Sequence, residues 1–395
     1  MKSNWKEERL GSLVRFSSGG TPNKNNPDYW NGTIPWISAK NMKSEVIETS
    51  DLSITEEGLI HGSKIAPKGS LLLLVRGSGL FNGIPVCYLE NAVAYNQDVK
   101  CIESTSELEN KYLFYWLKAN SGYLRKKIEF TSIGAGKFDT RFLSNLVVRF
   151  PDKVTRKKII DIADNISDRI NINKKINENL LQQARALFRK WFSITSSGLY
   201  KLSDIADINP ETYSPKENWS FVNYLDTSNI TSGTINEVQY IIPSEGKLPS
   251  RARRILRKDD VVFSTVRPNQ LHYGIISNPK PNMLGSTGFA VIRSKYETMP
   301  NEIIYLALTE SAFVEQMQQL AEQSVSTFPS IRPADLDACV LPEPKEDDNN
   351  FMETIKSIFN AVAINNEENQ RLATLRDTLL PRLMSGELDV SSLDF

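Results

Sequence analysis

The sequence contains few of the residues from which metal centres, disulfide frameworks and membrane spans are built. Its 395 residues include three cysteines and two histidines, and no two cysteines form a Cys-x-x-Cys pair. This composition argues against a structural disulfide and a zinc centre. The longest strongly apolar run, Leu71 to Val75, is far too short to cross a bilayer. The N-terminal segment lacks the apolar core of a signal peptide, so we expect a cytoplasmic protein.

Positive and negative side chains balance in this sequence. Lys and Arg together number 47 and Asp and Glu number 47, which gives a formal net charge of zero. Any contact with nucleic acid must therefore come from local basic patches and not from a global field. The hydrophobic content of 40% and the charged content of 24% are ordinary for a globular protein of two or three domains.

Motifs of catalysis are incomplete or absent. Segment 131–137 resembles a phosphate-binding loop only superficially, because Thr131 replaces its first glycine and Phe138 follows its lysine. Segment 77–83 begins like a dinucleotide fingerprint but has Asn82 in place of the third glycine. No Asn/Asp-Pro-Pro-aromatic tetrad occurs, as an adenine methyltransferase would need, and no nuclease or hydrolase constellation is recognisable. We predict that the chain alone is not an enzyme and binds no cofactor or metal of its own.

A long amphipathic segment occurs twice. Apolar residues recur at steps of three and four through 155–192, which predicts a helix with one apolar stripe. When the two copies of the segment are aligned so that Leu180 matches Leu372, two asparagines of the first copy also match two of the second. Such asparagines fix the register of a helix pair, because an Asn facing Leu is unsatisfied whereas an Asn facing Asn is not. We therefore predict mutual pairing, with two helices on separate cores as the alternative. The predicted helix-pair interface consists of Ile166, Ile170, Asn173, Asn177, Leu180, Leu187, Ile358, Val362, Asn365, Asn369, Leu372 and Leu379.

The ends of both helices have sequence signals. Thr155 is the expected N-cap of the first helix, and Asp347 or Asp348 is expected to begin the second. Pro381 removes a backbone donor and clashes with the preceding turn, which predicts a kink or break after Leu380. We expect the second helix to stop near Gly386.

The segments before each long helix have a mixed α/β pattern. Strands are predicted at 71–76, 85–88, 99–103 and 146–150, with helices at 110–118 and 121–129. Segment 68–76 aligns with 258–267 after one extra residue, and further matches keep nearly the same offset, which is typical of a duplicated domain. We predict a first globular domain at 1–152, a long helix at 153–195, a second globular domain at 196–345, and a second long helix with a tail at 346–395.

This order of elements, together with the segment Leu375 to Leu388, LRDTLLPRLMSGEL, resembles the specificity subunit (HsdS) of Type I restriction-modification systems. The resemblance covers essentially the whole chain. It implies an α/β (α+β) fold with internal duplication and pseudo-two-fold symmetry, in which two target recognition domains are separated by an antiparallel coiled coil of the two helices. It also implies double-stranded DNA and two methylation subunits (HsdM) as partners, and restriction subunits (HsdR) through them. S-adenosylmethionine, ATP and Mg would then belong to the partner subunits.

Candidate DNA contacts lie on loops that follow the predicted strands. Phosphates are bound by Lys and Arg, and base edges are read by Arg, Asn, Gln, Ser and Thr on loops that reach a groove. Both repeats supply such residues at similar places, although any one of them could equally be a solvated surface charge. The predicted DNA-binding residues are Lys40, Asn41, Lys43, Arg76, Ser78, Asn82 and Lys137 in the first repeat, and Ser228, Asn229, Arg251, Arg253, Arg254, Arg267, Asn269 and Gln270 in the second.

The sequence therefore favours a non-catalytic specificity subunit that reads a bipartite DNA target. The alternative is a coiled-coil scaffold whose two globular domains bind other proteins, which the absence of net positive charge would suit. DNA binding that weakens steeply with salt would separate the two, because each neutralised phosphate releases counterions. A methyltransferase with its own recognition domain is disfavoured by the missing tetrad.

Overall fold

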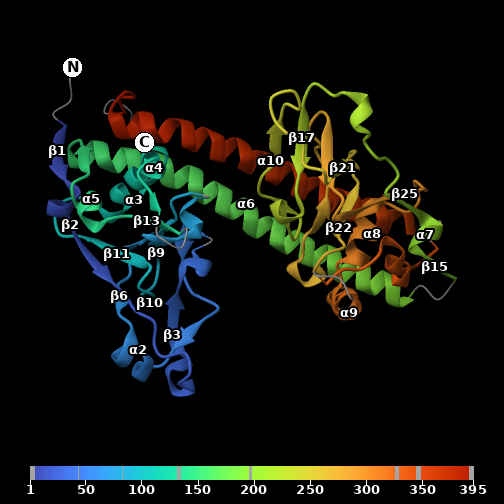
Figure 1. Ribbon diagram of the computed structural model, residues 1–395, viewed down its shortest axis with the longest axis horizontal. Helices are drawn as coiled ribbons and strands as arrows, with labels where there is room; N and C mark the ends of the chain where they lie inside the picture. Colours follow the sequence, from blue (N-terminus) through green and yellow to red (C-terminus); the bar gives the residue numbers. More distant parts are fainter. Residues whose placement is uncertain are drawn as a thin grey trace. The chain divides into compact units, whose positions relative to one another are not determined.

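The computed structural model describes residues 5–390, apart from 43, 82, 131–134, 195–197, 325–328 and 344–347. The chain divides into two compact units. Unit 1 comprises Met1–Asn171 and Asn369–Phe395, and unit 2 comprises Ile172–Glu368. Both boundaries fall inside the two long helices, so each unit contains one globular domain and half of each helix (Figure 1).

The globular part of unit 1 is built on a five-stranded sheet with the order β2-β11-β7-β9-β4 and a four-stranded sheet with the order β5-β3-β10-β6. All four leucines of β7 are buried, as expected for a strand covered on both faces. A three-stranded ribbon, β12-β13-β8, and the pair β1-β14 complete the sheets. The strands of unit 1 are β1 (Lys6–Arg9), β2 (Val14–Ser18), β3 (Trp30–Ile37), β4 (Val46–Ile47), β5 (Ser53–Ile54), β6 (Ile65–Ala66), β7 (Leu71–Leu74), β8 (Arg76–Gly77), β9 (Val86–Leu89), β10 (Val93–Tyr95), β11 (Val99–Ser104), β12 (Glu129–Phe130), β13 (Gly136–Lys137) and β14 (Val147–Phe150).

The helices of unit 1 differ from expectation in one place. The helix predicted at 121–129 ends at Arg125, because Glu129 and Phe130 pair with β13 and are held in an extended conformation. The short helices of unit 1 are α1 (Leu10–Leu13), α2 (Glu56–Gly62), α3 (Asn110–Ala119), α4 (Ser121–Arg125) and α5 (Thr140–Ser144), with single 3-10 turns η1 (Pro27–Tyr29), η2 (Ala39–Asn41) and η3 (Ser78–Phe81).

Unit 2 repeats this topology. Its sheets have the orders β16-β25-β22-β23 and β20-β17-β24-β21, which correspond to β2-β11-β7-β9 and β5-β3-β10-β6 of unit 1. The predicted internal duplication is thus visible in strand order. The elements of unit 2 are β15 (Leu199–Lys201), α7 (Leu202–Ile205), β16 (Ala206–Ile208), η4 (Pro215–Glu217), β17 (Val222–Leu225), η5 (Thr227–Asn229), β18 (Ile230–Thr231), β19 (Thr234–Ile235), β20 (Gln239–Ile241), β21 (Ala252–Ile255), β22 (Val261–Ser264), η6 (Pro268–Gln270), β23 (Tyr273–Ile275), β24 (Met283–Ser286), β25 (Phe289–Ser294), α8 (Asn301–Leu308), α9 (Ser311–Glu322), η7 (Pro333–Ala338) and β26 (Val340–Pro342).

The two long helices are α6 (Lys153–Ile194) and α10 (Asn349–Ser385). The cap of α6 is Asp152 and not Thr155 as predicted. The Asp152 carboxylate accepts the backbone N–H groups of Val154 and Thr155 at 3.0 Å and the Thr155 hydroxyl at 2.9 Å. These hydrogen bonds, the one from the Thr155 backbone first, lower the pKa of Asp152.

The second helix continues through Pro381 and ends at Ser385, with Gly386 at a φ of +74°. The predicted stop is confirmed. Of the kink or break predicted after Leu380, the break is wrong, because the helix continues to Ser385. Pro381 itself is exposed, but Leu380, Leu383 and Met384 around it are buried in the core of unit 1. We attribute the intact helix to this packing, which holds the last turn despite one missing backbone donor.

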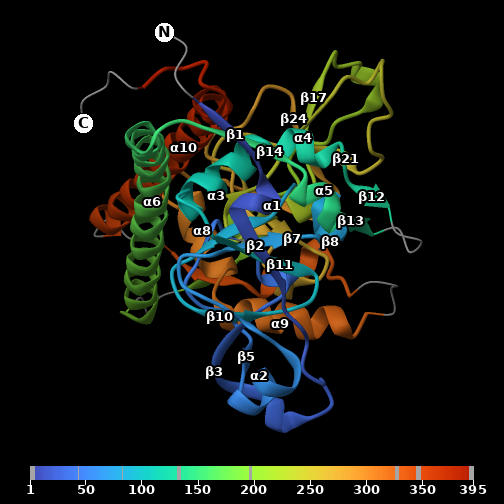
Figure 2. The ribbon, with the colours of Figure 1, turned by 90° about the vertical axis from the view of Figure 1, so that its left-hand side faces the viewer.

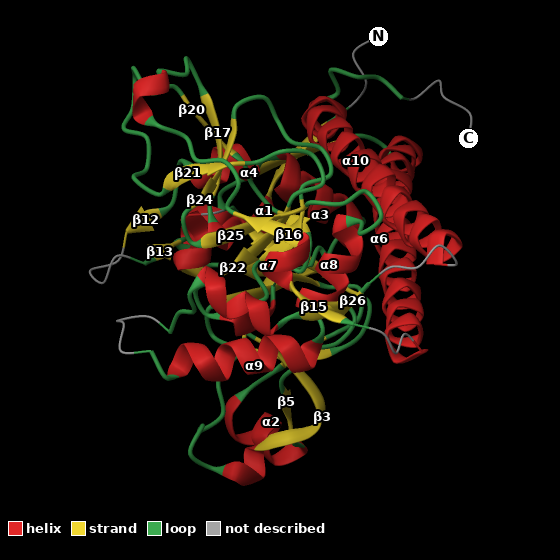
Figure 3. Cartoon of the chain, turned by 90° about the vertical axis from the view of Figure 1, so that its right-hand side faces the viewer, coloured by secondary structure: helices red, strands yellow, loops and turns green. Residues whose placement is uncertain are grey.

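The helices run antiparallel in each unit (Figures 1 and 3). In unit 2, the Asn365 amide donates to the Asn177 side-chain oxygen at 2.8 Å, and the Asn173 amide donates to Glu368 at 2.8 Å. Further along, Trp191 stacks on Phe351 with ring centroids 5.1 Å apart. Contacts that move forward along α6 therefore move backward along α10.

The burial of the predicted interface residues is uneven. Asn173, Asn177 and Ile170 are buried. Leu187 was wrongly assigned to the seam, since 37% of it is exposed and Phe188 faces the core of unit 2 in its place. The predicted residues that are half-buried are Ile166, Leu180, Ile358, Val362, Asn365, Asn369, Leu372 and Leu379.

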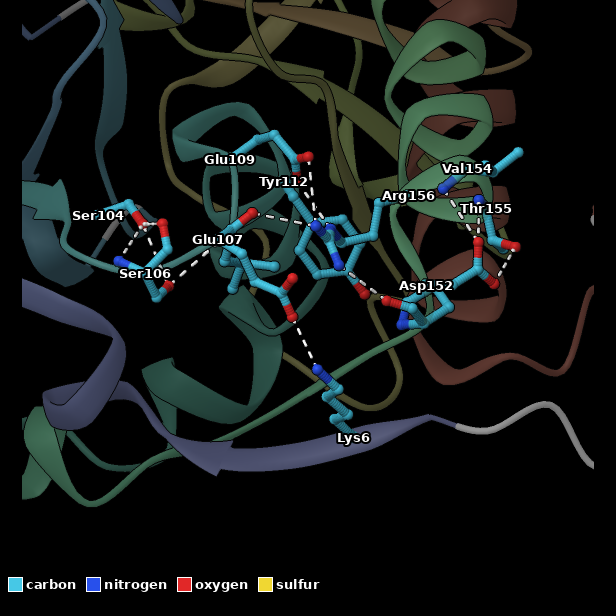
Figure 4. Close-up of polar contacts among 12 residues, drawn as sticks. Lys6, Ser104, Ser106, Glu107, Glu109, Tyr112, Asp152, Val154, Thr155 and Arg156 are labelled. Carbon is cyan, nitrogen blue, oxygen red and sulfur yellow. Dashed lines mark hydrogen bonds and ion pairs between the residues drawn. The ribbon is translucent and has the colours of Figure 1, made fainter.

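Polar contacts fasten α6 to the globular part of unit 1 (Figure 4). Arg156 is only 1% exposed, and its guanidinium donates to both Glu109 oxygens at 2.7 and 3.3 Å. It also donates to the carbonyl oxygens of Pro151 and Glu107, each at 3.0 Å. Every side of this buried cation is thereby hydrogen-bonded, which offsets much of its desolvation.

A second ion pair fastens the C-terminal half of α10 to the same unit. Arg376 donates to both oxygens of Glu45 at 2.9 Å, and Lys118 of α3 also contacts Glu45. Burial raises the pKa of Glu45, but the charges of Lys118 and Arg376 outweigh it, so the pKa lies below its usual value. Because Glu45 follows η2 closely in the chain, this pair ties the helix to the segment that carries Lys40 and Asn41.

Candidate nucleic-acid interface

Two parallel strands of unit 1 end side by side and bring predicted DNA-binding residues together. β3 pairs in parallel with β10, so η2 and residues 96–98 emerge at one edge, and the Asn96 N–H donates to Ile37 at 2.9 Å. The Asp98 carbonyl accepts the N–H groups of Val75 at 2.9 Å and Arg76 at 3.2 Å. Arg76 lies opposite Lys137 in the β8-β13 pair. We call this group, formed by residues 38–41, 96–98, 76 and 137, the strand-end corner of unit 1.

The corner encloses a hollow of about 520 Å³ that is lined by Lys40, Ser38, Trp36 and residues 96–98, among others. Lys40 is exposed at its rim. Asn41 has a structural role, because its side-chain oxygen accepts the Ser38 hydroxyl at 2.7 Å and the Ser38 N–H at 3.2 Å. The hollow is thus shaped by a capped turn and offers a lysine and amide side chains to a ligand.

The corresponding strands of unit 2, β17 and β24, are also parallel and end at an equivalent corner. There the Gly288 carbonyl accepts the Thr265 N–H at 2.8 Å, as Asp98 accepts that of Val75 in unit 1. The Thr287 N–H donates to the Arg251 carbonyl at 2.8 Å, which brings the exposed Arg251 to the same edge. We call residues 226–229, 287–288, 251 and 266–270 the strand-end corner of unit 2.

In this corner, Asp226 holds Ser228. The Asp226 carboxylate accepts the Ser228 N–H at 3.2 Å and its hydroxyl at 3.0 Å, and it accepts the Tyr224 hydroxyl at 2.8 Å. Burial raises the pKa of Asp226, but hydrogen bonds from Tyr224 and Ser228 outweigh it and leave the pKa below its usual value. Asn229 is half-buried in the same turn. Ser228 therefore shapes the turn, as Asn41 does in unit 1.

Two of the predicted arginines are less available than expected. Arg253 and Arg254 are half-buried at a β-bulge in β21, where Arg254 pairs with Gly285 and Ala252 with Ser286. Burial lowers the pKa of Arg254, and its guanidinium lies 3.5 Å from the Thr212 hydroxyl. Bulges re-aim side chains, and this one leaves Arg251 as the exposed arginine of the predicted trio.

Arg267 occupies a different position from the one predicted. Val75 and Thr265 correspond to each other, because their N–H groups make matching hydrogen bonds. Arg76 therefore corresponds to Val266 and Gly77 to Arg267. No extra residue separates the repeats here, in contrast to the alignment made from the sequence. Both Gly77, at φ +136°, and Arg267, at φ +48°, have left-handed backbones. A left-handed arginine is strained by roughly 1–3 kcal/mol, and such strain clusters at functional sites.

The remaining predicted residues are placed as follows. Ser78 is exposed in η3, next to Arg76. Asn269 and Gln270 are exposed in η6, where the Asn269 N–H donates to Gln318 of α9 at 3.2 Å. Lys43 and Asn82 lie outside the described residues.

Sequence reasoning missed an aromatic and basic group in unit 1. Phe130 is 76% exposed and stacks on Phe81 with ring centroids 5.3 Å apart. Three consecutive exposed cations, Arg125, Lys126 and Lys127, precede it closely in the chain. The cationic triplet between Tyr123 and Phe130 was the signal available in the sequence.

The side chains exposed on these surfaces are of the kinds that bind nucleic acid. Among the described residues, no group of three His, Cys, Asp or Glu side chains is arranged to hold a metal ion. All three cysteines are free and buried, and burial raises the pKa of Cys87 and Cys339 to about 12, which suppresses the nucleophilic thiolate. No helix among the described residues is long and apolar enough to cross a membrane. What the corners offer is exposed cations with amides and hydroxyls, as DNA phosphates and base edges require.

Comparison with known proteins identifies the class. The family described as "Type I restriction modification DNA specificity domain" matches residues 2–182. The chain is 30% identical over 162 residues, or 40% of each protein, to the specificity subunit of the Type I restriction enzyme EcoR124I/EcoR124II of Escherichia coli. It is 24% identical over 420 residues to the specificity subunit of the Type I restriction enzyme MjaIX of Methanocaldococcus jannaschii, which covers 99% of this chain and 95% of that protein.

The fold is shared with the S subunit of a Type I restriction-modification system from M. genitalium, with a TM-score of 0.55, 15% identity, and coverage of 97% of this chain and 96% of that one. The sequence matches place the chain among the DNA-recognition subunits of restriction-modification systems, which are non-catalytic targeting subunits. Residues 2–182 belong to the family of Type I restriction-modification DNA specificity domains, and over nearly its whole length the chain is similar in sequence to a specificity subunit of such a system. Its role is therefore DNA recognition within a complex of several subunits, and the scaffold alternative is not supported.

Proposed function

We propose that the two strand-end corners read the two halves of a bipartite DNA target, one half per unit. The chain docks two methylation subunits (HsdM) and, through them, restriction subunits (HsdR), in the cytoplasm. S-adenosylmethionine, ATP and Mg are bound by those partners, while this chain supplies the sequence reading.

One observation carries this proposal. The same topological corner, at the ends of two parallel strands, recurs in both units with different side chains. Unit 1 presents Lys40, Arg76 and Lys137, whereas unit 2 presents Arg251 and Arg267. A duplicated scaffold with divergent residues at one place is suited to reading two different sequences.

Duplication also supports two methylation subunits per chain, because a partner that binds one copy of a surface finds a second copy. The C-terminal ends of the two helices are not free for this docking, since Phe188 and Trp191 are buried in unit 2 and Leu380, Leu383 and Met384 in unit 1. A mass measurement at saturating partner tests the number; a stable one-to-one complex would contradict it.

The test of bipartite reading begins by mapping methylated adenines in cells that carry this chain and its methylation subunit. Arg76→Ala should weaken or alter one half-site, and Arg267→Ala should affect the other. Each loss should be about 1–3 kcal/mol if the arginine contacts a guanine edge.

The controls are Arg141→Ala in unit 1 and Lys280→Ala in unit 2, which remove exposed cations outside the corners. They should leave both half-sites unchanged. Effects of Arg76→Ala and Arg267→Ala on the same half-site would refute the assignment of one half per unit. Binding of DNA that did not weaken with salt would refute the role of the corners as phosphate-binding surfaces.

A further inference from the structure

The ribbon β12-β13-β8 exposes to solvent an aromatic side chain that contributes little to the packing of the core. Phe130 is 76% exposed and belongs to β12, the outer strand of this ribbon, which is labelled in Figure 2. Its ring stacks on Phe81 at an interplanar angle of 21°. Phe81 is itself held in place, because Arg125 donates to its carbonyl oxygen at 3.0 Å. One face of the exposed ring is therefore covered by Phe81.

Glycines make room for this arrangement. Phe130 lies opposite Gly136, which lies opposite Gly77, so one row of the ribbon contains a single side chain. A Cβ atom on Gly136 would lie 2.9 Å from Ile128 and 3.1 Å from Leu80. Gly136 thus lets Ile128 and Leu80 pack closely against the ribbon, and Phe130 supplies the one side chain of its row.

Exposed cations lie on segments close to Phe130 in the chain and in the ribbon. The next row of the ribbon contains Lys137 and Arg76, both exposed, and Glu129, and because side chains alternate along a strand these three project from the face opposite to Phe130. The exposed triplet 125–127 lies at the end of α4, where Lys127 is 5.8 Å from the ring centroid of Tyr123. Cations interleaved with exposed aromatic rings suit a polyanion that also has flat apolar faces, and DNA bases between phosphates are such a ligand.

The ribbon is continuous with the strand-end corner, because Arg76 and Lys137 belong to both. At the equivalent place among the described residues of unit 2, a bridge between Val266 and Ser330 stands where β8 pairs with β13. As far as the chain is described, the two units therefore differ in the structure beside their corners.

We propose that Phe130 is an apolar wedge that enters between two stacked bases of the half-site read by unit 1. This rests on the proposed function, in which the corner of unit 1 binds that half-site. The exposed cations at the end of α4 bind phosphates beside the inserted ring, and Phe81 covers one face of the ring. Inserted phenylalanine and leucine side chains unstack one base step and bend the duplex, which brings more protein surface onto the DNA.

The experiment uses the complex of this chain with its methylation subunits and a duplex carrying the mapped target. 2-Aminopurine, which fluoresces more strongly when unstacked, replaces adenines of the half-site one at a time. The methylated adenines are left out, because they must leave the stack for the chemistry itself. We expect the wild-type complex to raise the fluorescence beside one step of the half-site of unit 1.

Phe130→Ala should abolish that rise and weaken binding by about 5- to 150-fold, the range found for loss of one aromatic contact with a base. Phe130→Leu keeps an apolar wedge and should retain most of both effects. Ile60→Ala is the matched control, because Ile60 is 72% exposed in the same unit but lies near Glu56 and Glu57 of α2. It should change neither readout.

Three outcomes are distinguishable. If Phe130→Ala binds as tightly as the wild type and gives the same fluorescence, the wedge is refuted. If at the same time Arg76→Ala loses its half-site, the proposed function stands without the wedge. If the wild-type complex binds the mapped target without salt dependence, the proposed function itself fails. Unchanged thermal unfolding of the Phe130 variants would show that any loss arises from binding.

Discussion

Replacing Glu109 with alanine should destabilise unit 1 more than any change at the neighbouring surface carboxylate. Arg156 is 1% exposed, and without Glu109 its charge would keep only two neutral acceptors, the carbonyls of Pro151 and Glu107. Breaking a buried ion pair by removing one partner costs about 3–5 kcal/mol. The Glu109 side chain is itself 32% exposed, so water can reach the vacated space and we expect a value near the lower limit, about 3 kcal/mol.

For a unit of about 200 residues, 1 kcal/mol shifts the unfolding midpoint by about 2–4 °C, so Glu109→Ala should lower the Tm of unit 1 by about 6–12 °C. Calorimetry is the suitable assay, because two units can unfold in separate transitions. Glu107→Ala is the control, since Glu107 forms an exposed ion pair with Lys6 at 2.8 Å, and its loss should not move either transition.

Whether a second substitution raises or lowers the stability gives the sharpest test. Arg156→Met keeps the apolar stem and removes the charge, so adding it to Glu109→Ala should recover stability. A double variant less stable than Glu109→Ala alone would refute the reasoning, because it would show that Arg156 stabilises unit 1 without its carboxylate partner.

Three further predictions concern the helices. Asn177→Leu should destabilise unit 2 by about 1–3 kcal/mol, because it leaves the Asn365 amide without its acceptor. Adding Asn365→Leu in the same chain should recover much of this loss in thermal unfolding, and no recovery would show that the two amides do not act as a pair. The pKa of Glu45 is lowered in the folded state, so the stability that this carboxylate contributes is present above its unfolded pKa of about 4.5 and is lost as the pH falls through the folded pKa. Glu45→Gln should therefore reduce the loss of stability at acid pH that urea unfolding measures, and an unchanged pH dependence would contradict this. The third change inserts about four residues, equivalent to about 6 Å, into both helices at the boundary between the units. The unread spacer between the half-sites of the mapped target should lengthen by about two base pairs, while the bases of both half-sites stay the same. An active variant with an unchanged spacer would contradict this prediction.

The position of Trp191 in the fold illustrates what the sequence does not reveal. Apolar spacing places Trp191 on the helical stripe, but only the fold shows that it is buried against Phe351 in the core of unit 2. An insertion after Trp191 would therefore act inside unit 2, and the helix segment between the units lies some five turns earlier in α6.

The sequence by itself determined the elements and their repetition. Apolar periodicity, the closing Gly386 and the paired asparagines are local or repeating signals, and they predicted two long helices between two similar α/β domains. Helical periodicity needs only neighbours three and four residues apart, so it can be read without knowledge of the rest of the chain.

Only the tertiary structure decided which side chains of the candidate site are available. Ser228 and Asn41 carry hydrogen-bonding groups that suit base reading, yet both are engaged in shaping their own turns. Arg267 corresponds to Gly77, and Phe130 is exposed, because strand register is set by pairing between segments distant in sequence. A shift of one residue along a strand reverses the face on which a side chain lies, so composition alone cannot show which residues of a recognition surface reach the DNA.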